Sequence, residues 1–237
     1  MFELSMEYTK CHIKELTRNY SAAFFTLFFP AILLQLFSHS SPSSTQASNM
    51  MIYIIYCNYA VQTVMLQALG ITVSAARKNL FTDYIKTLPV STLPSTVGRI
   101  LSSLCFAFFS LSVVILVFYL NHLSDFSFKS HLIVCSCALL GGIPMAMIAI
   151  FLGNVLNPAA SRSVFVLLNL LLLFGSYVLS DHGVIGLLRE SIPSYQWLLF
   201  STDTLTGKTP MYPLLWMLGY TVLFYLLTKV VTERKIL

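Results

Sequence analysis

The segment Ile100–Leu120 reads ILSSLCFAFFSLSVVILVFYL and contains no charged residue. One helix needs about 20 apolar residues to cross a bilayer core about 30 Å thick, and this segment has that length. Across the 237 residues of the chain, 57% are hydrophobic and 10% are charged. Soluble domains carry about 25% charged residues, so the composition predicts an all-α membrane protein.

Five further segments are apolar enough to cross a bilayer. Together with Ile100–Leu120 they give six predicted transmembrane helices, at Tyr20–Phe37, Met50–Val73, Ile100–Leu120, His131–Leu152, Ser163–Leu179 and Tyr212–Val230. None contains Asp, Glu or Arg, and Lys229 and His131 lie at span ends, where their polar groups can reach the interface. Because no stretch between the spans is long enough to fold alone, we expect residues 1–237 to form a single transmembrane domain.

The distribution of basic residues predicts the orientation, because Lys and Arg near span ends stay in the cytoplasm. With the N-terminus inside, all but Lys129, Arg189 and Lys208 of the 14 Lys and Arg residues lie on the cytoplasmic side. We therefore expect a multi-pass protein of the plasma membrane with both termini in the cytoplasm. The net charge of +5 reflects this topology, so no nucleic-acid partner is expected.

Two segments outside the predicted spans are also expected to be helical. Residues 1–19 can form an interfacial helix with apolar side chains on one side and charged ones on the other, the basic residues contacting membrane lipid. A solvated tail is the alternative. Residues 181–211 are too long for a tight connection and too apolar for a free loop, which predicts a helical hairpin in the outer leaflet.

Polar side chains inside the spans have two interpretations. Asn58 and Gln62 lie one helical turn apart, Gln67 follows on the same span, and Asn169 lies in the fifth. Such amides can form hydrogen bonds between helices or line a passage, and the sequence does not separate these roles. Gly141–Pro144 interrupts the fourth span, and we favour close packing there over a hinge.

Signatures of catalysis and of metal binding are missing from the sequence. It has no His-Glu-x-x-His, no Gly-x-Ser-x-Gly, no phosphate-binding Gly-x-x-x-x-Gly-Lys-[Ser/Thr] loop, and no carboxylate inside a predicted span. We therefore expect neither catalytic residues nor a metal site in this chain. The lack of intramembrane carboxylates also weakens the case for an ion-coupled carrier.

The order of these features resembles the membrane-spanning (permease) subunit of type-2 ATP-binding-cassette (ABC) transporters. The similarity covers nearly the whole chain: an amphipathic N-terminal helix, six spans, a basic segment after the second span and a hairpin before the sixth. Its sharpest local element is Thr87-Leu88-Pro89-Val90-Ser91, followed by Gly98-Arg99-Ile100-Leu101. The family often has an acidic residue and a Gly-Thr pair ahead of Pro-Val-Ser, whereas this chain has Ala76–Phe81 there.

The resemblance implies that residues 74–99 form a cytoplasmic coupling segment that contacts a separate ABC ATPase subunit. The residues carried over to this contact are Arg77, Lys78, Phe81, Tyr84, Lys86 and Pro89. ATP and Mg would be held by the ATPase, with no cofactor in this chain. A second membrane subunit, identical or paralogous, would complete the translocation unit, and a path between the subunits would be lined by Asn58, Gln62, Gln67 and Asn169.

The resemblance also implies a bacterial protein, and the function implied is export of an amphipathic or apolar cargo, such as a peptide, an antibiotic or a lipid-like molecule. Two alternatives come from other classes. The chain could be a non-transporting immunity or scaffold protein that binds a toxic peptide in the membrane, or a secondary carrier driven by an ion gradient.

Overall fold

The computed structural model describes residues 2–18, 20–38, 46–78, 93–121, 127–177 and 183–234, and every regular element in these ranges is a helix. The elements are α1 (Phe2–Arg18), α2 (Tyr20–Ser38), α3 (Gln46–Thr63), the π-helix η1 (Val64–Leu69), α4 (Gly70–Lys78), α6 (Leu93–Leu120), α7 (Phe128–Val155), α8 (Ser161–Tyr177), α9 (Gly183–Glu190), α10 (Pro193–Leu205) and α11 (Met211–Arg234). The predicted all-α class is confirmed for this part of the chain.

The described helices include four that are long and apolar enough to cross a membrane. They are Asn49–Arg77, Pro94–Leu120, Phe128–Val155 and Met211–Val231. A fifth is reached if α1 and α2, which meet at a bend of 72°, are counted as one span. The apolar part of α8, Ser161–Ser176, is shorter than these. The structure thus shows four or five candidate spans where the sequence predicted six.

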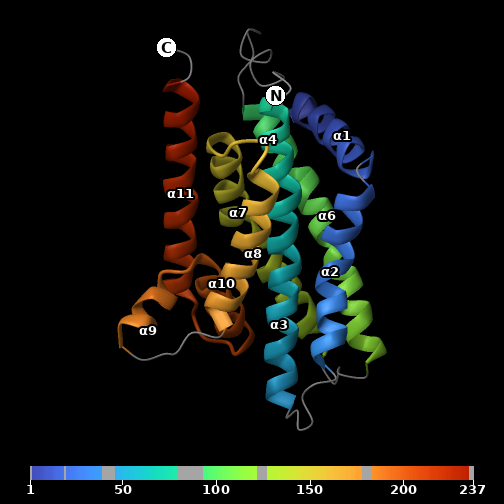
Figure 1. Ribbon diagram of the computed structural model, residues 1–237. Coiled ribbons are helices and arrows are strands. Elements are labelled where there is room, and N and C mark those ends of the chain that lie inside the picture. Colours follow the sequence, from blue (N-terminus) through green and yellow to red (C-terminus); the bar gives the residue numbers. More distant parts are fainter. Residues whose placement is uncertain are drawn as a thin grey trace.

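Six segments stand side by side along the bundle: α2, the continuous α3–η1–α4 rod, α6, α7, α8 and α11 (Figure 1). Helix α1 lies obliquely at one end of the bundle, and α11 finishes at that same end. Helices α9 and α10 lie at the opposite end. Of these six, α2 with 19 residues and α8 with 17 are the shortest, and α1 rather than α2 lies at the end of the bundle where α11 finishes.

The α3–η1–α4 rod forms the centre of the bundle. In its most apolar window 78% of the residues are buried, against 6% for Met211–Val231 at the periphery. The rod packs against α2, α6, α7, α8 and α10. Half of the largest fully buried side chains come from it, including Tyr53, Tyr59 and Met65. The rod therefore supplies a large part of the packed core.

Helix α7 runs without interruption through Gly141, Gly142 and Pro144. A side chain at Gly141 would overlap with the indole of Trp197 on α10, whose Nε1 donates to the Cys137 carbonyl at 3.1 Å. At Gly142 an added Cβ would press on Val61 of α3. These glycines serve close helix packing, because their neighbours occupy the space of a side chain.

Candidate functional site: a groove beside the central rod

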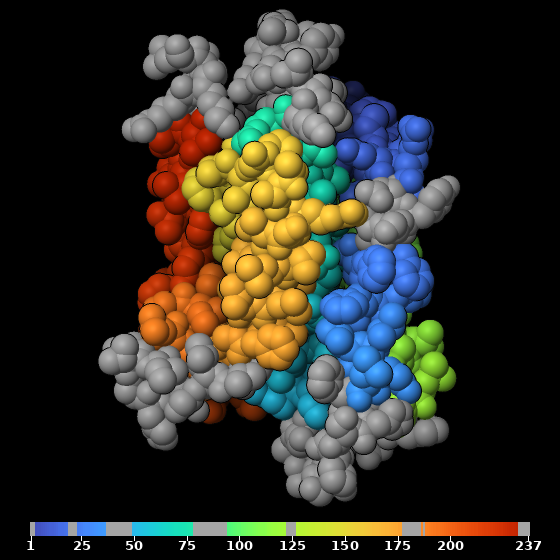
Figure 2. Space-filling view, viewed as in Figure 1, coloured from blue at the N-terminus to red at the C-terminus, as the bar shows by residue number. Residues whose placement is uncertain are grey.

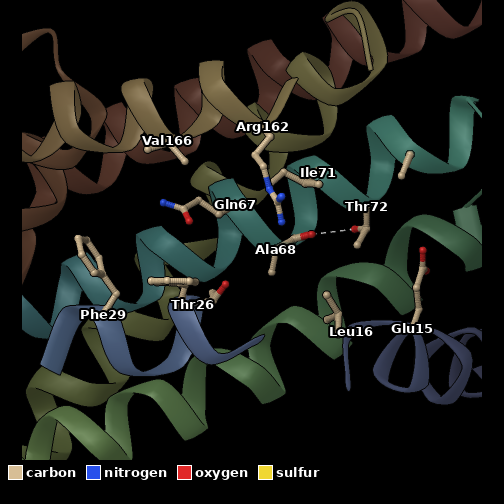
Figure 3. Close-up of a pocket in the computed structure, with 12 residues that line it drawn as sticks. Glu15, Leu16, Thr26, Phe29, Gln67, Ala68, Ile71, Thr72, Arg162 and Val166 are labelled. Atoms are coloured by element: carbon tan, nitrogen blue, oxygen red, sulfur yellow. Dashed lines mark hydrogen bonds between the residues drawn. The ribbon is translucent and has the colours of Figure 1, made fainter. Parts of the chain in front are cut away.

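A cavity of about 460 Å³ lies between α1, α2, the η1–α4 part of the rod and α8 (Figure 3). Helices α2 and α8 both pack on η1, one on each side of the groove. Figure 2 shows the same face, on which α8 and α2 both reach the molecular surface. The walls are mostly apolar and include Leu16, Phe25, Phe29, Ile71 and Val166.

On both α2 and α8, the residues that line the groove are spaced one helical turn apart. Phe25 and Phe29 follow each other on α2, and Arg162 and Val166 follow each other on α8. Residues four apart lie on one face of a helix, so each pair extends along the groove. Phe25 is 58% exposed and Val166 39%, so these side chains line the groove without closing it.

Gln67 brings an amide to this largely apolar groove. It belongs to η1, whose other five residues are buried, and its carboxamide points into the cavity (Figure 3). Among the described residues this carboxamide has no hydrogen-bond partner. Segments of π-helix are rare and frequently occur at functional sites, since the widened turn changes which side chains face outward.

The other three amides proposed for a path lie elsewhere, inside the packed core. Asn58, Gln62 and Asn169 are each at most 2% exposed. Gln62 donates to Oδ1 of Asn169 at 2.8 Å and to its backbone carbonyl at 3.1 Å. Asn169 donates to Thr63 Oγ1 at 3.0 Å. Asn58 lies 3.4 Å from Ser201 Oγ. Of the four predicted amides, only Gln67 reaches the groove.

Arg162, at the first turn of α8, is the cation of the groove. Its side chain is exposed and extends over the cavity toward the rod (Figure 3). The guanidinium forms no hydrogen bond or ion pair with the part of the chain that the structure describes. In the sequence, Arg162 counts only among the basic residues that predict the orientation, although it is a lone Arg directly before an apolar helix.

Glu15 on α1 borders the same end of the groove (Figure 3). Partial burial raises the pKa of its carboxyl, and the nearby positive charge of Arg99 acts in the opposite direction. Arg99, on the first turns of α6, is thus the charged neighbour that acts on this carboxyl.

Helix α1 is fixed to the bundle by a stripe of polar residues. Ser5, Thr9 and His12 are buried, and Thr9 Oγ1 lies 3.3 Å from the Gly98 carbonyl of α6. His12 bonds through Nδ1 to Ser102 of α6 and through Nε2 to Thr72 Oγ1 of α4 at 3.0 Å. The contact holds α1 as one wall of the groove. Its sequence signal was the i, i+4, i+7 spacing of Ser5, Thr9 and His12.

Burial lowers the pKa of His12 to about 4, with a smaller effect from the charge of Arg99. The imidazole is consequently neutral at physiological pH, with one ring nitrogen donating and the other accepting. Thr72 Oγ1 and Ser102 Oγ also lie within donor range of backbone carbonyls. One hydroxyl therefore accepts from the ring N–H, and the other must direct its hydrogen to the ring instead of to its carbonyl.

Of the residues carried over to the coupling contact, Arg77 is the one whose side chain the structure describes. Its guanidinium donates to the carbonyl of Asn154 and, at 2.8 Å, to that of Leu156. These carbonyls lie at the C-terminal end of α7, so Arg77 joins the ends of α4 and α7. Lys78 ends α4 but its side chain, together with Phe81, Tyr84, Lys86 and Pro89, falls outside the described residues.

The predicted coupling segment 74–99 and the predicted hairpin 181–211 can be placed only in part. Within 74–99, residues 74–78 belong to α4 and 93–99 to α6. Within 181–211 lie α9 and α10, and α10 is packed into the bundle through Trp197, Leu198 and Ser201. Whether 74–99 faces the cytoplasm and 181–211 the outer side stays a prediction.

The described residues hold no cluster of three or more His, Cys, Asp or Glu side chains able to bind a metal ion. A search of known protein families finds no match to the chain, and neither does a search of curated protein sequences. The groove itself is the feature from which a function can be argued. It combines apolar walls with a few polar groups, among them the Gln67 amide, the Arg162 guanidinium and the Glu15 carboxylate, which suits an amphipathic ligand.

Proposed function

We propose that the chain is the permease subunit of an ATP-driven ABC exporter that moves an amphipathic or apolar cargo. The observation that supports this most directly is the groove, with Gln67 on its rod side and Arg162 above it. A ligand with one polar and one apolar part could enter such a groove sideways from a leaflet. An aqueous ion would find few polar groups there.

The proposal includes six spans with both termini in the cytoplasm. Six segments that lie side by side, with α1 and the end of α11 at one end of the bundle, support it. In this arrangement α2 and α8 are the first and fifth spans, although each is short, and α1 is an interfacial helix. At 1.5 Å per residue, the 17 residues of α8 reach about 25 Å, so its ends would lie near the headgroups.

The Arg77 contact supports a coupling role for residues 79–92. Because the guanidinium joins the ends of α4 and α7, a force applied to the segment after α4 would reach two spans together. One of them, the α3–η1–α4 rod, carries Gln67 into the groove. ATP-driven closure of a partner ATPase could in this way reshape the groove. A second copy or a paralogue would complete the translocation unit.

The test uses the full chain, tagged and purified from its own host in mild detergent, with vanadate-sensitive ATPase activity as the readout. We expect the wild-type preparation to contain this activity, and the double variant Lys78→Glu, Phe81→Ala to lose it. Arg77 is left unchanged, since its substitution would disturb the fold. Lys129→Glu, at the opposite end of the bundle, is the control and should retain the activity.

The absence of ATPase activity would contradict the proposal. If neither the wild-type preparation nor a chemically cross-linked one contains ATPase activity, the permease proposal is wrong. The immunity or scaffold alternative would then be pursued with the same purified protein.

A further inference from the structure

The groove has apolar walls and, one helical turn away along α8, a cationic group. Phe25, Phe29 and Val166 form apolar walls on α2 and α8, and Arg162 lies one helical turn from Val166. A volume of about 460 Å³ falls within the range of about 300–1,000 Å³ of small-molecule sites. A ligand that fits this order has an anionic group at one end and an apolar chain below it.

Arg162 supplies the positive charge for an anionic ligand group. Its guanidinium is exposed and makes no hydrogen bond or ion pair with any described residue, so its donors are available to a ligand. Arg presents a planar fork of donors that matches phosphate oxygens in a bidentate way. Glu15 is the one described carboxylate that lines the groove, and burial raises its pKa while the charge of Arg99 acts in the opposite direction.

The position of the cation within the bundle also fits a lipid headgroup. Arg162 borders the same part of the groove as Leu16 and Glu15 of α1 (Figure 3). Helix α1 has exposed charged residues beside exposed Leu4 and Met6, as a helix at the membrane surface has. The guanidinium would therefore lie near the phosphate level of one leaflet, and Phe29 and Val166 nearer its acyl chains.

We propose that the groove binds a glycerophospholipid of the adjoining leaflet, with its phosphate on Arg162 and one acyl chain along Phe25, Phe29 and Val166. Gln67 lies beside the chain and can accept or donate a hydrogen bond to an ester group. The inference goes beyond the permease proposal and does not depend on it, because a bound lipid can be measured without an ATPase. An amphipathic cargo would have to displace this lipid.

The experiment is native mass spectrometry of the full chain, purified in mild detergent, with phospholipid detected as a mass increment. We expect one phospholipid to stay bound to the wild type. Arg162→Gln should retain about tenfold less, since the phosphate loses a charge-assisted hydrogen bond. Val166→Trp should also lose the lipid while keeping the guanidinium, because the larger ring fills the chain site. The control Lys14→Gln removes an exposed cation of α1 that does not line the groove, and it should retain the lipid.

A second readout separates the two parts of the ligand. Added phosphatidylglycerol should raise the unfolding temperature of the delipidated wild type, and should do so much less for Arg162→Gln. Diacylglycerol, which lacks the phosphate, and inorganic phosphate, which lacks the chain, should have little effect on the wild type. Equal lipid retention in the wild type, Arg162→Gln and Val166→Trp would overturn the assignment. So would a wild type that holds no phospholipid.

Discussion

Gln62 and Asn169 join the central rod to α8 through their side-chain amides, with Nε2 of Gln62 2.8 Å from Oδ1 of Asn169. Both residues are buried, and the Asn169 amide in turn donates a hydrogen bond to Thr63 Oγ1. This arrangement fits the interhelical role that the sequence left open for these amides. Their role in a path stays a prediction.

Replacing Asn169 tests that interhelical role. Asn169→Leu leaves the Gln62 amide without its side-chain acceptor in a buried site, which should cost about 1–2 kcal/mol of folding free energy. We expect a lower unfolding temperature of the purified protein in detergent. Leu167→Ala, at a position of α8 that is 58% exposed, is the control and should change it little. An unchanged unfolding temperature for Asn169→Leu would argue against a structural role.

Gly141 and Gly219 form a matched pair on two helices. An added Cβ at Gly141 would overlap with the Trp197 indole, whereas at Gly219 on α11 it would meet nothing within 4 Å. Gly141→Ala should therefore lower stability by about 1–3 kcal/mol, as overpacked cores do. Gly219→Ala should be neutral or slightly stabilising, because Ala favours a helix over Gly. The two unfolding temperatures decide the matter, and equal values would contradict the close packing of α7 on α10.

Arg77 is predicted to act first as a structural residue. Arg77→Ala removes two hydrogen bonds from a cation to carbonyls at the end of α7, and should cost about 2 kcal/mol. Arg18→Ala, on the exposed side of α1, is the control and should be neutral. The loss should appear in the isolated chain, with no partner present. If Arg77→Ala is as stable as wild type, the contact between α4 and α7 contributes little.

His12 predicts a pH dependence of stability. Its pKa is about 4 in the folded protein and near 6.5 in an unfolded chain, so the unfolded state binds more protons between these values. Stability should therefore fall as the pH drops from 6.5 toward 4, by at most about 3 kcal/mol from this residue. The contribution is fully present above pH 6.5.

The measurement compares the unfolding temperature of wild type and His12→Asn across pH 4–7. Glu15, whose raised pKa acts in the opposite sense, titrates in both proteins, so the difference isolates His12. A parallel decline of the two proteins with falling pH would show that His12 is not the group responsible.

The apolar segments could be found from the sequence because membrane spans are a local property of composition. Ile100–Leu120 illustrates the limit. Helix α6 begins earlier, at Leu93, and includes Gly98 and Arg99, which were assigned to the coupling segment 74–99. Gly98 allows α1 to pack closely on α6, because an added Cβ there would overlap with Tyr8, and no local pattern reveals a contact with residues so distant in the sequence.

The groove was not predictable for a related reason. Its walls come from α1, α2, η1–α4 and α8, and their pairing depends on which helices are neighbours in the bundle. Gln62 faces α8 and Gln67 faces the groove. Residues five apart lie on different faces of a helix, but the sequence does not show which face meets which neighbour. The π-helical turn Val64–Leu69 that contains Gln67 also leaves no distinct hydropathy period.

The π-helical turn Val64–Leu69 also determines where the rod can lose one residue without changing which faces its side chains occupy. A π-turn closes from residue i to i+5, one residue more than an α-helical turn. Deleting one residue within 64–69 would return the rod to a regular α-helix and leave Gln62 and Arg77 on the faces they now occupy. A deletion elsewhere in α3 or α4 would rotate everything beyond it by about 100° and break the contact of Arg77 with α7.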